Sequence, residues 1–470
     1  MPPAAAQRWP SRQGGPEGMG RVVETRELMG RVPGQETTGD HRLVAGVAVV
    51  AVLLTGGRWI SHLHVGPLYV GDALLAGAFL LAVWTSALSG KRPGRLAGPG
   101  ILVGLLLVIT AMRLLDVQTD MPTAARDAAP YAYAAIAYLS AHSFQKVGAR
   151  GRERTVRVIH CALLLHLGWM AVATLAPDFV ATLPPVGNTR IFEIRTDFDV
   201  AVLGLLAGVS VLRLRPGWIW LHTSVAAATL VTALAQANRA GLISCCACVL
   251  VAVMFRAGRN GRITLRAVLL GALAVLSVLV VLPMSPAGQR LLALNAGPAA
   301  SSELVESAQG TTRARLTAWE RVVTYTLDDP VRTAVGVGFG PDFLQLSNGD
   351  LPIGRGMGVR SPHNYLVNTF ARLGVIGLTV VVALLTSLVT VMVRTVRRGP
   401  PDELTSLCVL VVLSLLIVAL LGVILESPFG ATPFFWAAGV LLAGARSRRA
   451  RLRQKPEQNT FVRSPQEVRV

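Results

Sequence analysis

The sequence predicts an all-α, polytopic integral membrane protein with about 12 transmembrane helices and one long extracytoplasmic loop. Only 15% of its 470 residues are charged, against roughly a quarter in a soluble protein. Hydrophobic residues make up 52%, and they lie in long, nearly uncharged runs such as 404–425 that show neither strand alternation nor a one-sided helical pattern. Arginine and lysine gather in alternate connections between these runs. Together these observations exclude a soluble globular protein.

Twelve candidate spans follow one another along the chain, because a span needs about 20 apolar residues and somewhat fewer inside a bundle. They are 43–58, 68–88, 98–115, 128–142, 156–176, 198–212, 217–237, 241–255, 264–285, 366–393, 404–425 and 429–445. The first, fourth, sixth and eighth are short, which leaves the number of spans open by one or two.

The positions of the basic residues predict the orientation, since cytoplasmic connections of membrane proteins collect Lys and Arg. Every second connection contains at least two cations, as do both tails. Both termini are therefore expected in the cytoplasm. The resulting organisation is a disordered basic tail (1–42), nine spans (43–285), an extracytoplasmic loop (286–362), spans 10–12 (363–445) and a second basic tail (446–470).

The net charge of +19 is explained by this topology and by attraction to anionic membrane lipid, so nucleic acid is not an expected partner. The five cysteines all fall inside apolar runs, which indicates neither a disulfide framework nor a zinc site. For the spacing of Cys245 and Cys248 we expect a role in helix packing rather than in metal binding. No metal site is predicted.

The chemistry is expected in the long loop, because a loop of this length inside a compact protein is usually functional. A helix is predicted over 313–327, where Arg315 and Trp319 share one face, preceded by Arg313. A Gly-rich turn comes after it, in which the N–H groups near Gly338 and Gly340 can approach an anion. A Walker phosphate motif is absent.

Two further residues stand out at the predicted outer interface. His363, followed by Asn364, directly precedes the tenth span, and a histidine with a pKa near 6.5 can accept a proton from a hydroxyl group. Arg239 lies between two apolar spans, where an arginine needs a partner or a function. Guanidinium groups bind phosphate oxygens in a bidentate manner, so Arg239 and Arg315 together can hold a diphosphate. The alternatives are a packing or capping histidine and an arginine that snorkels to the interface.

From His363 onward the pattern becomes specific. His363-Asn364, nine residues, Gly374, two residues and Gly377 resemble the signature of the bacterial O-antigen ligase and polymerase family. The chain is also similar to that family in its twelve apolar segments, its long loop before the last three spans and its Arg-x-x-x-Trp helix. The resemblance covers roughly residues 45–445.

The resemblance implies an inverting glycosyltransferase that moves a glycan from undecaprenyl diphosphate to an acceptor on the outer face of the bacterial cytoplasmic membrane. It also implies no nucleotide, metal or other cofactor, because the diphosphate is already a leaving group. His363 would deprotonate the acceptor, Arg239 and Arg315 would stabilise the diphosphate, and Asn364, Trp319, Gly338, Gly340 and Arg313 would bind substrate.

Ligase and polymerase activity remain open, since the family includes both. The acceptor also stays open between a glycan, a lipid and a protein, because an arginine-rich, lysine-poor chain fits GC-rich genomes that include organisms without lipopolysaccharide. A transporter of lipid-linked glycans is the rival from another class, but transporters often have two related halves, and here the long loop interrupts only one half.

Overall fold

The computed structural model describes thirteen separate stretches of the chain. They are residues 38–61, 63–65, 68–69, 77, 99–116, 120–144, 147–186, 189–214, 216–236, 238–260, 303–353, 360–399 and 402–458. The predicted spans 68–88 and 264–285, the N-terminal tail to residue 37 and the first part of the long loop fall almost entirely outside these residues. All thirteen stretches belong to one compact unit, Thr38–Val470.

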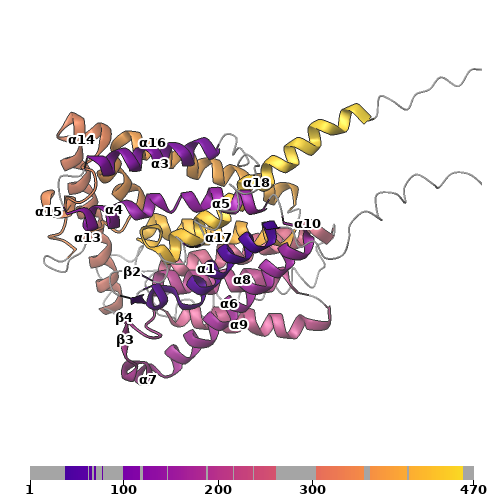
Figure 1. Cartoon of the computed structure of the whole chain (residues 1–470). Helices are drawn as coiled ribbons and strands as arrows, with labels where there is room; N and C mark the ends of the chain where they lie inside the picture. The colour runs from indigo at the N-terminus through magenta and orange to yellow at the C-terminus, as the bar shows by residue number, and fades with distance from the viewer. Residues whose placement is uncertain are drawn as a thin grey trace, which may run out of the picture. The chain divides into compact units, whose positions relative to one another are not determined.

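The described residues are mostly helical (Figure 1). The helices before the long loop are α1 (Thr38–Ser61), α3 (Pro99–Leu115), α4 (Met121–Ala132), α5 (Ala135–Phe144), α6 (Ala149–Leu175), α7 (Pro177–Thr182), α8 (Thr196–Leu212), η1 (Pro216–Trp218), α9 (Ile219–Ala235) and α10 (Arg239–Asn260). The helices from the loop onward are α13 (Glu303–Leu327), α14 (Pro330–Val335), α15 (Phe343–Leu346), α16 (Tyr365–Arg398), α17 (Glu403–Leu421), η3 (Ile424–Glu426) and α18 (Pro428–Gln458).

Most predicted spans coincide with one of these helices, and two differ from the prediction. The span 128–142 is two helices, α4 and α5, because Pro130 lacks an N–H group and a turn at Tyr133 comes after it. The span 404–425 ends at Leu421, where Gly422 adopts an extended conformation. The helix expected over 313–327 begins earlier, at Glu303.

Five of the described helices are long and apolar enough to cross a membrane: 149–175, 239–256, 365–398, 403–421 and 428–445. Three shorter apolar helices, 46–61, 99–115 and 219–235, accompany them. The protein is therefore a multi-pass helical membrane protein, while the number of twelve spans stays a prediction. The described residues also contain two short antiparallel hairpins, β1 (His64–Val65) with β2 (Leu68–Tyr69) and β3 (Pro185–Val186) with β4 (Thr189–Arg190), which the all-α prediction did not include.

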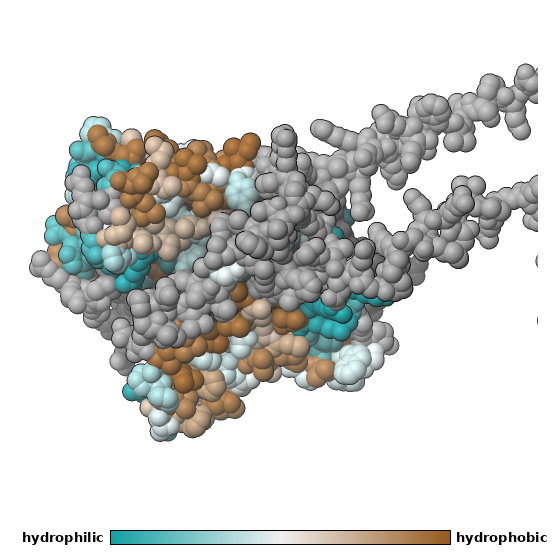
Figure 2. All heavy atoms as spheres, viewed as in Figure 1, coloured by the Kyte–Doolittle hydropathy of each residue, from teal (hydrophilic) through white to brown (hydrophobic). Residues whose placement is uncertain are grey.

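Apolar side chains cover the exposed faces of the long helices. On α3 the exposed apolar residues recur at helical spacing along one face: Ile101, Leu105, Val108, Met112 and Leu115. Figure 2 shows this apolar surface over α3 and α16, whereas hydrophilic residues gather around α14 and α15. An apolar exposed face of this kind is typical of a helix that contacts lipid.

Small residues bring α8 and α10 into close contact. A side-chain carbon added at Gly204 would lie 2.6 Å from Cα of Cys245, and one at Gly208 would lie 3.1 Å from the carbonyl oxygen of Cys248. Both cysteines are buried and unpaired by disulfides. The expected packing role of these cysteines is confirmed, because glycines four apart let a neighbouring membrane helix approach closely.

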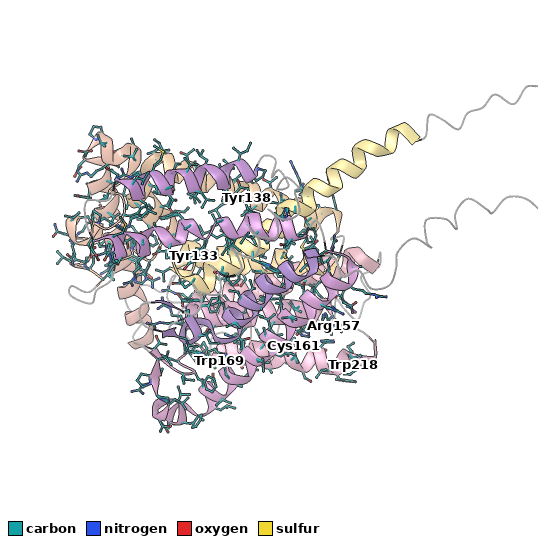
Figure 3. The ribbon with its side chains drawn as sticks, viewed as in Figure 1. Tyr133, Tyr138, Arg157, Cys161, Trp169 and Trp218 are labelled. Atoms are coloured by element: carbon teal, nitrogen blue, oxygen red, sulfur yellow. The ribbon has the colours of Figure 1, made fainter. Side chains whose placement is uncertain are left out.

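Helix α6 links this pair to α1. Arg157, Cys161 and Trp169 succeed one another along α6 (Figure 3), and the Trp169 indole donates a hydrogen bond to the carbonyl oxygen of Thr55 in α1. Arg157 pairs with Glu153 one turn away.

A kink in α16 receives the Gly-rich turn of the loop. Gly374 has φ 62°, a conformation that glycine adopts without steric cost, and it interrupts the helical hydrogen bonds. The carbonyl groups of Ala371 and Arg372 are thereby free to accept the N–H groups of Val337 (2.7 Å) and Gly338 (3.0 Å). The backbones approach so closely that a side-chain carbon at Gly336 would lie 2.3 Å from the carbonyl carbon of Arg372. The glycine of the signature therefore fixes the turn on the helix that begins after His363.

Candidate functional site

His363 occupies a strained position directly before α16. Its φ is 57°, and a residue with a side chain rarely adopts this left-handed conformation unless its surroundings hold it there. Asn364 caps the helix, because its Oδ1 accepts the N–H groups of Leu366 and Val367. The Asn364 side-chain nitrogen donates to the carbonyl oxygen of Leu420 (3.2 Å). The predicted substrate-binding asparagine is thus already engaged in fixing the start of the helix.

The residues on either side of His363 are held by four different elements. Arg360 pairs with Asp127 of α4 (3.0 Å), and the carbonyl group of Pro362 accepts a hydrogen bond from the Trp319 indole of α13. The Ser361 hydroxyl interacts with the carboxylate of Glu426 in η3. Asn364 contacts the end of α17 through the carbonyl group of Leu420. Contacts with these four elements therefore hold His363 in its left-handed backbone conformation.

Arg315 lies at the end of α17, beside this segment. Its Nη1 donates to the carbonyl oxygen of Leu421 (3.1 Å), one of the carbonyl groups that the last turn of a helix leaves without a partner. Trp319 lies one turn later on α13, on the face predicted from the sequence. Arg315 and Trp319 thus both lie next to His363.

Arg239 contacts α13 close to Arg315. Its Nη2 donates to the hydroxyl of Thr312 (3.1 Å), and Thr312 lies three residues before Arg315. The side chain of Asn238 accepts the N–H of Gly241 (2.7 Å) and fixes the start of α10. The structure therefore brings the two predicted arginines to neighbouring positions on one helix face.

A third arginine of this region was not predicted as a site residue. Arg195, at the start of α8, lies near enough to His363 and Arg315 for its charge to act on both. It pairs with Asp197 (2.9 Å). The sequence did not indicate a role for Arg195 in the site, because opposite charges so close together in the chain suggest only a local ion pair with Asp197.

These charges determine the titration of His363. Burial lowers the pKa of its imidazole to about 4, and the positive charges of Arg315 and Arg195 act in the same direction, while Asp197 opposes them. The pKa near 6.5 expected from the sequence is therefore wrong for this structure. Burial also lowers the pKa of the Arg315 guanidinium, which no nearby carboxylate fully compensates.

The Gly-rich turn is held by a buried ion cluster. Oδ2 of Asp127 accepts the N–H of Gly340 (3.0 Å) and pairs with Arg372 (2.9 Å), whose side chain is 2% exposed. Arg372 also donates to the carbonyl groups of Gly338 (3.2 Å) and Pro341 (2.8 Å). The N–H groups of Gly338 and Gly340 thus already have acceptors within the protein, and the acceptor of the Gly340 N–H is itself an anion, the carboxylate of Asp127.

The last predicted residue, Arg313, is exposed on α13, two positions before Arg315.

Besides Arg195, three further residues of this region were not predicted from the sequence: Asp127, Arg360 and Glu426. Arg372 carried the clearest signal, since a charge inside an apolar span usually indicates a functional or paired group.

Comparison with known proteins agrees with the motifs that these residues form. The model of the family described as O-antigen ligase matches residues 224–382, which contain Arg239, Arg315, Trp319, His363 and Asn364. No curated protein gives a significant match to the chain. Residues 224–382 of the chain are therefore similar to the O-antigen ligase family, the family that the motifs of the sequence resemble.

Proposed function

We propose that this protein is a glycosyltransferase of the O-antigen ligase type, which transfers a glycan from undecaprenyl diphosphate to an acceptor hydroxyl group. The family match supports ligase- or polymerase-like activity in general. We place the reaction on the outer face of the bacterial cytoplasmic membrane, with both termini in the cytoplasm. The reaction that we propose needs neither nucleotide nor metal.

One observation carries the proposal: His363 and Arg315 lie together at the end of α17, with Arg195 near both. A proton acceptor and a group of cations are the two requirements for displacing a diphosphate with a hydroxyl nucleophile. The end of a span is also where a donor anchored in the bilayer can present its diphosphate to groups that water reaches.

In this mechanism the acceptor oxygen attacks the anomeric carbon while its proton passes to the imidazole of His363. The bond between the anomeric carbon and the diphosphate oxygen breaks, and undecaprenyl diphosphate leaves. A single displacement inverts the configuration at the anomeric carbon. Arg315 and Arg239 stabilise the negative charge that develops on the leaving diphosphate.

The low pKa of His363 fits this sequence of events. In the free protein the neighbouring arginines oppose protonation of the imidazole, which keeps it neutral. A bound diphosphate neutralises those arginines and adds negative charge, which raises the pKa of the imidazole. Donor binding therefore makes His363 a stronger base at the moment when a base is required.

The other predicted residues take supporting roles. Trp319 and Asn364 hold the segment that presents His363, and Gly338 and Gly340 form the turn that Asp127 and Arg372 fix. Exposed Arg313 is suited to contact the glycan or the acceptor rather than the diphosphate.

The function is tested by supplying the purified protein with a lipid-linked glycan and candidate acceptors, without nucleotide or added metal, and identifying the products by mass. A glycan joined to a lipid, protein or separate polymer acceptor supports a ligase. Growth of the lipid-linked glycan itself supports a polymerase. Unchanged donor with every acceptor, including the lipid-linked glycan alone, would contradict the proposal.

A further inference from the structure

Glu426 is a buried acidic group beside the His363 segment that the proposed mechanism does not use. It ends η3, between α17 and α18. Its Oε1 atom is buried, and within the stretches that the structure describes it has no hydrogen-bond partner. A buried carboxylate oxygen is costly, so a carboxylate in this position calls for an explanation in the groups around it.

Ser361 connects Glu426 with the backbone of His363. The Ser361 hydroxyl interacts with the Glu426 carboxylate, and the same oxygen accepts the N–H of His363 (3.2 Å). A hydroxyl group can donate one hydrogen bond and accept others at the same time. The chain of contacts therefore runs from a carboxylate, through one hydroxyl, to the residue with the left-handed backbone.

We propose that Glu426 is a positioning residue, whose carboxylate orients the Ser361 hydroxyl so that this hydroxyl holds the backbone of His363 in its left-handed conformation. This inference rests on the proposed function for its consequence in catalysis. Its structural part, the coupling of Glu426 to the His363 backbone, can be measured without any reaction.

The surroundings of Glu426 make this coupling sensitive to pH. Burial raises the pKa of its carboxyl to about 7, and the charge of Asp127 acts in the same direction, while Ser361 and Arg372 oppose them. Tyr131 of α4 and Tyr365 of α16 lie near enough for the charge of Glu426 to act on their phenol groups. None of the charged groups that act on it comes from the described parts of α17 or α18.

The direction of this pH dependence follows from the hydrogen bonds between Glu426, Ser361 and His363. Above the pKa, the ionised carboxylate accepts a hydrogen bond from the Ser361 hydroxyl, which leaves a lone pair of the hydroxyl oxygen directed at the N–H of His363. Below it, the neutral carboxyl group donates to Ser361 instead, and a charge-assisted hydrogen bond is lost. The support of His363 should therefore weaken as the pH falls through about 7.

The coupling is tested by NMR on protein labelled with ¹⁵N-histidine, in which loss of one amide signal in His363→Gln identifies His363. Between about pH 6 and pH 8 the amide signal of His363 should shift in the wild type with a midpoint near the Glu426 pKa. In Glu426→Gln, which keeps an acceptor oxygen but does not titrate, the shift should be absent. Glu403→Gln is the matched control, because Glu403 is half-buried and pairs with Arg213 at the other end of α17 (2.6 Å).

Kinetics give the second readout. Ser361→Ala and Glu426→Ala should each lower kcat about ten-fold with an unchanged KM for the donor, since a misplaced base slows the chemical step. If Glu426 acts through Ser361, the double variant loses no more than either single variant. Losses that multiply, or a His363 amide that titrates identically in Glu426→Gln, would overturn the inference. A wild type without transfer activity but with the expected NMR shift would instead contradict only the proposed function.

Discussion

The guanidinium group of Arg315 donates a hydrogen bond to the carbonyl oxygen of Leu421 at the last turn of α17, with Nη1 and oxygen 3.1 Å apart. This contact uses one of five N–H donors of the arginine. It fixes the side chain beside His363 before any ligand binds, so little conformational entropy remains to be lost when a diphosphate engages the other donors.

From this arrangement we predict that Arg315→Ala and Arg239→Ala each lose most transfer activity, through weaker stabilisation of the diphosphate. Lysine at either position should restore activity only in part, because an ammonium group keeps the charge but not the bidentate geometry. Donor binding and turnover are the measurements. Arg321→Ala is the control on the same helix, since Arg321 donates to the carbonyl oxygen of Asn348. Unchanged donor binding in both alanine variants would leave these arginines with a structural role only.

A second prediction concerns the charge around His363. Because Arg315 lowers the pKa of the imidazole, Arg315→Ala should raise it above the value of about 4. Undecaprenyl diphosphate should raise the pKa in the wild type as well. NMR titration of the histidine ring signals, with His363→Gln for assignment, measures both changes. If neither the substitution nor the added undecaprenyl diphosphate shifts the pKa of His363, these charges have no effect on its imidazole.

The buried ion cluster gives a prediction on stability. Asp127→Ala leaves Arg372 and Arg360 without their shared carboxylate and should destabilise the protein by about 3–5 kcal/mol, as expected when one partner of a buried pair is removed. Thermal unfolding in detergent measures the effect. The control is Glu153→Ala, because Glu153 pairs with Arg157 and both side chains are exposed, so that this ion pair contributes little. Equal shifts in the two variants would show that the cluster does not stabilise the turn.

The topology can be tested on two exposed residues of a cysteine-free variant. A cysteine at position 320 on α13 should react with a membrane-impermeant reagent added from outside, because the long loop is predicted to be extracytoplasmic. A cysteine at position 153 near the start of α6 should be protected until the membrane is opened. Both native glutamates are exposed, so burial does not explain a difference between them. The reverse pattern would invert the orientation and move the proposed site to the cytoplasm.

Much of the site was predictable from local patterns. The spacing of Arg315 and Trp319 places them on one helix face, and the pairing of His363 with a capping asparagine indicates the start of a helix. Long apolar runs likewise predict helices whatever their neighbours are. These features depend on residues close together in the sequence.

The remaining features depend on contacts between distant segments. Asp127 and Glu426 are single acidic residues without a local motif, and only the packing of α4 and η3 brings them to the segment of His363. The low pKa of His363 likewise arises from burial and from Arg195, which lies on another helix. The structural role of Gly374 could not be predicted for a related reason. The carbonyl groups that its kink frees are used only because the distant Gly-rich turn donates hydrogen bonds to them.

The central claim, that His363 activates the acceptor, is tested most directly by comparing single-turnover transfer from bound donor in the wild type and in His363→Ala. His222→Ala serves as the control. His222 lies on α9, where its ring stacks on that of His160 with the centroids 6.2 Å apart, and it has no part in the proposed mechanism. Our account predicts a loss of about 10²–10⁴-fold in His363→Ala, the usual contribution of a positioned general base, with donor binding retained. Near-normal turnover by a well-folded His363→Ala protein would contradict the account and leave activation of the acceptor to another group.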